Sequence, residues 1–229
     1  MPSPLRLFRH LTPGLLALAA LAAVSSAEAS AAPIEGEPPS GALSFTVLRD
    51  GDEIGTHVLN FGHDGDALTV DVATDIKVTL PLVDIAVYRF THRAHEVWRD
   101  GRLSQLTSET DDDGEQHALS VVAEQGGALS VRSDLGAHAS AADIVPASLW
   151  NHAVPAQETL LNTLTGVEMA VTVEDLGRET ITVGGAERQA EHYKLTGDLA
   201  RELWYDGDGV LRRVRFQAED ESTIEYVLQ

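Results

Sequence analysis

The chain has 229 residues, of which 16 are lysine or arginine and 36 are aspartate or glutamate, so its formal net charge at pH 7 is −20. A charge of this size repels phosphate backbones and anionic lipid surfaces, which argues against nucleic-acid binding and against electrostatic adsorption to a membrane. The sequence contains no cysteine. Disulfide bonds, thiolate zinc sites and cysteine nucleophiles are therefore excluded.

The N-terminal segment, residues 1–29, has the three parts of a secretory signal peptide. Two arginines precede an apolar run over residues 15–24, and an Ala-Glu-Ala sequence ends at Ala29. We expect cleavage after Ala29, with Ala31 or Ala32 as alternatives. The apolar run is shorter than the roughly 20 residues that span a bilayer, so a membrane anchor is the less favoured interpretation. The sequence thus predicts a protein that is periplasmic or secreted and does not span a membrane.

The mature chain is predicted to be a single β-rich domain behind a short linker. Residues 30–40 are rich in proline and small residues, which predicts a disordered tether. Residues 41–229 are long enough for one sizeable core. Apolar and polar residues alternate along most of this domain, for example over 70–80 and 85–98, as is typical of half-buried strands.

Turn residues separate the alternating runs. The turns are predicted at the Asp-Gly and Gly-Gly pairs that begin at residues 50, 64, 100, 113, 126, 184 and 206. Their spacing indicates an antiparallel meander of about 11–13 strands. The expected fold is therefore all-β and mainly antiparallel, a large curved sheet or open half-barrel.

One segment, residues 146–166, interrupts the alternation and contains two prolines. It predicts a crossing connection with one or two short helical turns, which divides the strands into sets over about 42–144 and 167–229. Long ordered connections within a β-domain are more often functional than average. We refer to residues 146–166 below as the crossing segment.

A site for a lipid or another hydrophobic ligand is the functional hypothesis for this region. Trp150 is expected to plug or line the mouth of an apolar cavity in the curved sheet. Core packing is the alternative role for the tryptophans. The candidate ligand-binding residues are Trp98, Leu149, Trp150, His152, Leu160, Leu161 and Trp204.

Catalytic and metal-binding motifs are absent from the sequence. It has no Gly-x-Ser-x-Gly element, no P-loop, no dinucleotide fingerprint and no His-Glu-x-x-His spacing. The acidic turn over 111–115 has consecutive acids, unlike the alternating ligands of a calcium loop. Ser148 and His152, with Asp143 upstream, could form a hydrolytic triad, so a hydrolase stays an alternative. The sequence favours a protein that is not an enzyme, and it predicts no cofactor and no metal.

Five short segments carry a resemblance to known proteins. They are Gly51–Thr56, Tyr88–His92, Glu96–Leu103, Leu203–Asp206 and Ile224–Leu228. In order and spacing they resemble a family of exported bacterial proteins described only as a domain of unknown function. This family is distantly similar to the lipoprotein-carrier half-barrels, in which a curved antiparallel sheet wraps short helices around an apolar cavity. The resemblance implies that fold and a periplasmic location, and it carries over no catalytic residue.

The leading functional expectation is an exported, soluble β-protein that binds a hydrophobic ligand or a component of the cell envelope. A structural or interaction protein of the envelope is the second alternative to it, after the hydrolase. Its acidic face would meet a cationic partner, and salt would weaken that association.

Overall fold

The computed structural model describes residues 34–80 and 85–229. The expected signal peptide over 1–29, its cleavage after Ala29 and the first four residues of the expected tether lie outside the described residues. Within the described ranges, no helix is both long enough and apolar enough to cross a membrane.

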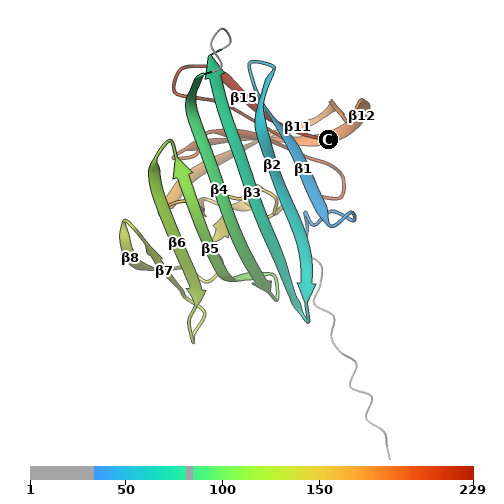
Figure 1. Cartoon of the computed structure of the whole chain (residues 1–229). Coiled ribbons are helices and arrows are strands. Elements are labelled where there is room, and N and C mark those ends of the chain that lie inside the picture. The colour runs from blue at the N-terminus through green and yellow to red at the C-terminus, as the bar shows by residue number, and fades with distance from the viewer. Residues whose placement is uncertain (1–33, 81–84) are drawn as a thin grey trace, which may run out of the picture.

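The described residues form one sheet of fifteen strands with a single turn of 3-10 helix, η1 (Figure 1). The elements are β1 (Ala42–Arg49), β2 (Asp52–Asp64), β3 (Ala67–Leu80), β4 (Ile85–Arg99), β5 (Arg102–Asp112), β6 (Glu115–Ala123), β7 (Leu129–Ser133), β8 (Gly136–Ser140), β9 (Val145–Pro146), η1 (Val154–Ala156), β10 (Thr159–Leu161), β11 (Glu168–Val183), β12 (Ala186–Gly197), β13 (Arg201–Tyr205), β14 (Leu211–Gln217) and β15 (Thr223–Leu228).

This architecture confirms the predicted all-β, mainly antiparallel class. The sheet has more strands than the expected number of about 11–13. Two short strands, β9 with two residues and β10 with three, lie at the start of or within the segment that was expected to be a connection. Alternation over so few residues is too brief to identify a strand from sequence. The expected helical turn in the crossing segment is present as η1.

The strand order is β8-β7-β6-β5-β4-β3-β2-β1-β15-β14-β13-β12-β11-β10-β9, so the sheet is two meanders joined where the first strand pairs with the last. Neighbouring strands are antiparallel except β9 and β10, which run parallel. The two edge strands, β8 and β9, follow one another in the chain but are not paired. The sheet is therefore an open, barrel-like structure whose gap lies next to the crossing segment.

Tight hairpin turns set the register of the long strands. The Asp50-Gly51, Asp100-Gly101 and Asp113-Gly114 pairs all have positive φ at both residues, the geometry of two-residue turns that match the twist of antiparallel strands. Aspartate and glycine tolerate this left-handed region better than most other residues. The predicted hairpins at these three pairs are thereby confirmed.

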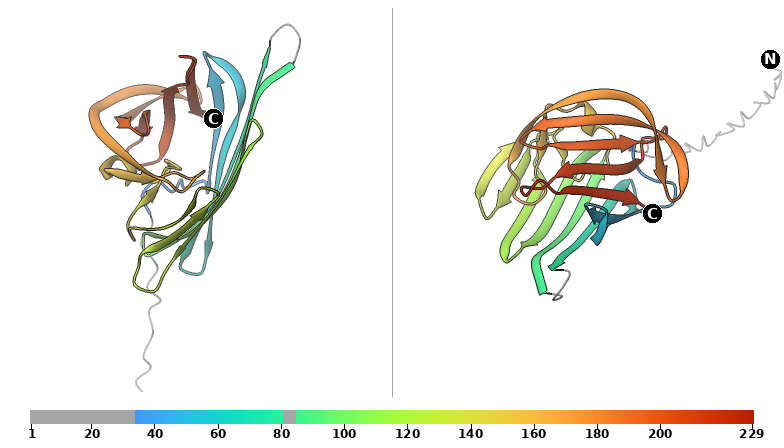
Figure 2. Two further views of the ribbon diagram at one scale, coloured as in Figure 1. Left: turned by 90° about the vertical axis from the view of Figure 1, so that its left-hand side faces the viewer. Right: turned by 90° about the horizontal axis from the view of Figure 1, so that it is seen from above.

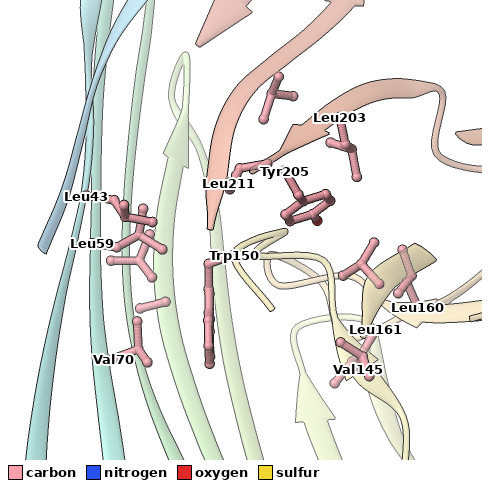
Figure 3. Packing of buried hydrophobic residues seen from close by; sticks show 14 of the residues in the cluster. Leu43, Leu59, Val70, Val145, Trp150, Leu160, Leu161, Leu203, Tyr205 and Leu211 are labelled. Carbon is pink, nitrogen blue, oxygen red and sulfur yellow. The ribbon is translucent and has the colours of Figure 1, made fainter. Parts of the chain in front are cut away.

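The two meanders enclose the core between them. Figure 2 shows β1–β6 as a tall curved wall and the C-terminal strands curling across its concave face. Trp150 from the crossing segment is fully buried at the junction, between Leu43, Leu59 and Val70 on one side and Leu203 on the other (Figure 3). Burial of aromatic and aliphatic side chains from both meanders explains how the domain is stable without disulfides.

Residues 34–36, expected to belong to a disordered tether, instead contact the crossing segment. The backbone carbonyl of Glu35 accepts a hydrogen bond from the backbone N–H of His152 at 3.1 Å. Gly36 is buried, with φ at +107°, and a Cβ at this position would lie 2.3 Å from the carbonyl oxygen of Trp150. These close backbone contacts hold Glu35 and Gly36 against the crossing segment, although the composition of residues 30–40 predicts disorder.

Candidate functional site

A cavity of about 350 Å³ lies on the concave face of the sheet. Side chains of β2–β4, the crossing segment, β11 and β13–β15 enclose it, and we call it the concave cavity. Most of its lining is apolar and includes Val72, Ile76, Phe90, Met169, Val214 and Phe216. Polar side chains interrupt the lining at His57, Thr74, His92, Glu96, Ser148 and Arg201.

The concave cavity has a closed end and an open end, which the burial of alternate residues along β4 reveals. Glu96 is fully buried and His92 is 5% exposed, whereas Phe90 and Tyr88 are half-buried. On the neighbouring strand, Ile76 is also half-buried. We refer to the Glu96 end as the floor and to the Tyr88 end as the mouth.

Glu96 places a carboxyl group in the floor of the cavity. Its Oε2 accepts hydrogen bonds from two buried indoles, Nε1 of Trp98 at 2.8 Å and Nε1 of Trp150 at 3.0 Å. Burial raises the pKa of Glu96, while the nearby Ser148 hydroxyl and the two indoles oppose this shift. Neither Glu96 Oε1 nor Ser148 Oγ makes a hydrogen bond of normal geometry. The floor thus contains two buried polar atoms that lack a protein hydrogen-bond partner of normal geometry.

A row of uncharged polar side chains crosses the middle of the cavity. His57, Thr74 and His92 line the cavity in register on β2, β3 and β4, and Thr110 on β5 continues the row beyond the lining. His57 Nδ1 lies 2.7 Å from Thr74 Oγ1, and His92 Nδ1 lies 2.8 Å from Thr110 Oγ1. Burial lowers the pKa of His57 to about 3 and that of His92 to about 4. Both imidazoles are therefore neutral at neutral pH, and this row adds hydrogen-bonding capacity without charge.

The residues expected to bind a ligand are divided between the cavity and the core. Leu149 lines the concave cavity. Trp150 lies behind the floor, packed edge-to-face against Trp98 with ring centroids 5.5 Å apart. Leu160 and Leu161 on β10 are fully buried in the core.

The two remaining candidates lie outside the concave cavity. Trp204 lies on the face of β13 opposite to Leu203 and stacks on His192, with ring centroids 4.2 Å apart. His152 lines a second cavity of about 670 Å³ next to Trp98. Among the seven candidates, Leu149 is thus the one whose side chain lines the concave cavity.

The possible triad of Ser148, His152 and Asp143 is not assembled. Ser148 Oγ is buried on the concave side beside Glu96 and makes no hydrogen bond to His152. His152 Nδ1 lies 3.0 Å from Glu35 Oε1. His152 and Asp143 line the second cavity, not the concave one. Across residues 34–80 and 85–229, no group of three or more His, Asp or Glu side chains is placed to hold a metal ion.

Several lining residues were not identified by the sequence analysis, chiefly Glu96, His57 and Arg201. The sequence pattern does indicate the position of Glu96. The alternation over 85–98 points Tyr88 and His92 inward, and it assigns Glu96 to the same inward face. A carboxylate at an inward position of a strand indicates either a buried partner or a ligand contact. His57 and Arg201 come from distant strands, and sequence spacing does not relate them to β4.

Comparison with known proteins supports the fold and the family. The structure is similar to a crystal structure described as a beta-barrel-like protein of domain of unknown function DUF1849 from Brucella abortus, with a TM-score of 0.60. The two are 10% identical, and the similarity covers 82% of this chain and 94% of the other, which shows a shared fold. No curated protein matches the chain. A family model described as a domain of unknown function, DUF6134, matches residues 45–229. The resemblance inferred from the sequence is thereby confirmed, and the chain belongs to the DUF6134 family.

Proposed function

We propose that this protein is exported to the periplasm or cell exterior and binds a hydrophobic ligand there in the concave cavity. The single observation that carries the proposal is the cavity of about 350 Å³ with a mainly apolar lining and an open mouth. Protein interiors are close-packed and contain few voids larger than a water molecule. Pockets that bind small molecules have volumes of about 300–1,000 Å³, so this cavity is of a suitable size.

The graded exposure of the cavity supports an elongated ligand. Apolar side chains of β3, β4 and β14 line it from the buried floor toward the half-buried mouth. A hydrocarbon chain would remove this apolar surface from water, at about 25 cal/mol for each Å² buried. The polar row across the middle adds sites for hydrogen bonds at one level, partway between the floor and the mouth.

The proposal is tested with the uncharged fluorescent probe N-phenyl-1-naphthylamine, whose emission rises in apolar surroundings. We expect saturable binding to the purified mature protein. Ile76→Trp, at the half-buried mouth, should weaken the binding because a larger side chain narrows the entrance. Val87→Trp is the matched control, since Val87 is 48% exposed and is not part of the cavity lining.

Two results would count against the proposal. One is an emission change that does not saturate with probe concentration. The other is equal loss of binding in the Ile76 and Val87 variants. Native mass spectrometry of the protein isolated from its own envelope provides a second test, because a bound lipid would be detected as a discrete added mass.

A further inference from the structure

Arg201 stands at the mouth of the concave cavity on the inward face of its strand. It is the first residue of β13 and alternates with Leu203 and Tyr205, whose side chains are fully buried. Its guanidinium carbon lies 3.7 Å from the centroid of the Phe216 ring. Within residues 34–80 and 85–229, its side chain donates one hydrogen bond, from Nη1 to the backbone oxygen of Ala200 at 2.7 Å. The other guanidinium N–H groups have no hydrogen-bond acceptor in this part of the chain.

Arg201 differs from the other half-buried arginines of the described ranges in its lack of a carboxylate partner. In the part of the chain that the structure describes, four other arginines are half-buried, and each pairs with a carboxylate: Arg49 with Asp220, Arg212 with Asp206, Arg213 with Glu225 and Arg215 with Glu202. Among the described residues, Arg201 has no such partner, although the chain contains 36 acidic residues. An uncompensated charge withdrawn from water is costly, so a half-buried arginine normally has an anionic partner.

Among the described residues, Arg201 is the one lysine or arginine that lines the concave cavity, and the nearest carboxylate at the mouth, that of Asp112, accepts a hydrogen bond from the hydroxyl of Tyr88 at 2.8 Å. The two lining histidines are neutral at neutral pH, and burial raises the pKa of both lining tyrosines, which keeps them neutral as well. The one lining carboxyl, Glu96, lies at the floor. Burial lowers the pKa of the Arg201 guanidinium, as expected of a cation that lacks a counter-ion.

We propose that Arg201 binds the anionic head group, a carboxylate or a phosphate, of a single-chain amphiphile whose hydrocarbon chain extends toward Glu96. The inference rests on the proposed function and adds the chemical class of the ligand. Planar guanidinium groups bind carboxylates and phosphates through paired hydrogen bonds. A volume of about 350 Å³ is at the small end for ligand pockets, which favours one chain over two.

The test compares ligands that share a twelve-carbon chain and differ in the head group. Laurate, dodecyl phosphate and the uncharged dodecanol each compete with N-phenyl-1-naphthylamine for the mature protein. Hydrogen bonds to a charged group predict that laurate or dodecyl phosphate binds about 10- to 100-fold more tightly than dodecanol. The stronger of the two anions identifies the head group as carboxylate or phosphate.

Arg201→Gln is expected to remove the preference for the anion while leaving the affinity for dodecanol within about twofold, because the apolar lining is retained. Arg201→Lys should keep part of the preference, since it keeps the charge but loses the paired hydrogen bonds. Arg215→Gln is the matched control, because Arg215 already pairs with Glu202 at 2.7 Å. Thermal melting of each variant verifies that it is folded.

The outcomes separate this inference from the proposed function. Equal affinities of the wild-type protein for laurate, dodecyl phosphate and dodecanol would overturn the role of Arg201 and leave hydrophobic binding intact. A preference for the anion that survives in Arg201→Gln would do the same. Failure of all three ligands to displace the probe, or the absence of saturable probe binding, would overturn the proposed function itself.

Discussion

Replacing Glu96 with leucine removes the acceptor that two buried indoles share. Trp98 and Trp150 donate to Glu96 Oε2 at 2.8 and 3.0 Å, and both are nearly or fully buried. Each indole N–H left without a partner costs about 1–3 kcal/mol. Glu96→Leu should therefore lower the free energy of unfolding by about 2–6 kcal/mol. Glu96→Gln is the matched control, because its amide oxygen can still accept both hydrogen bonds.

The raised pKa of Glu96 also predicts that the stability of the protein depends on pH, which the same two variants test. Burial raises the pKa of Glu96, so in the interval above the ordinary value of 4.5 the folded state retains a proton that the unfolded state has lost. The contribution of Glu96 to stability is complete below pH 4.5 and declines as the pH rises through the raised pKa of the folded state. Glu96→Gln cannot lose this proton, and the decline should be absent in that variant.

Urea unfolding followed by tryptophan fluorescence measures both effects, since the denaturation midpoint shifts with stability. The series covers the wild-type protein and both variants between pH 4 and pH 8. The reasoning is refuted if Glu96→Leu and Glu96→Gln unfold at the same urea concentration. It is also refuted if Glu96→Gln and the wild-type protein share the same dependence on pH.

Three further substitutions test how the meanders are held together and how the polar row behaves. Tyr205→Phe removes a hydrogen bond of 2.7 Å to a carbonyl of the crossing segment and should cost about 1–3 kcal/mol in urea unfolding; no change would contradict it. Gly36→Ala places a Cβ 2.3 Å from the carbonyl oxygen of Trp150 and should lower the melting temperature more than Gly51→Ala, which has φ of +94° but no contact within 4 Å. Because burial holds the pKa of His92 at about 4, stability should fall by up to about 3 kcal/mol as the pH falls from 6.5 toward 4. His92→Gln should flatten that decline, and an unchanged slope would refute the assignment.

The fold was largely predictable because its causes are local. Alternation of apolar and polar residues depends on neighbours two positions apart, and the Asp-Gly turns depend on adjacent residues. Both are visible in the sequence, as the runs over 70–80 and 85–98 show. The crossing segment was visible for the same reason, since Pro146 and the loss of alternation mark a break. The short strands β9 and β10 were not predicted because too few residues repeat the pattern.

The candidate site was predictable only in outline. The sequence indicated that the crossing segment contributes to a cavity, and Leu149 does line it. The sequence left two environments open for Trp150, the mouth of the cavity and the core, and both are apolar. In the structure Trp150 lies behind the floor, where Glu96 accepts the hydrogen bond of its indole N–H. An apolar side chain in the core and one in a ligand cavity look alike in sequence, because both are withdrawn from water.

The sequence by itself determined that this protein is a disulfide-free, acidic, antiparallel β-domain. It also showed that the alternating pattern of its strands is interrupted once, at the crossing segment. Only the tertiary structure decided that β1 pairs with β15, which brings the two meanders face to face. That pairing places Arg201 of β13 and Glu96 of β4 at opposite ends of one apolar cavity. Long-range strand pairing depends on how whole surfaces bury one another, and no local pattern of residues encodes it.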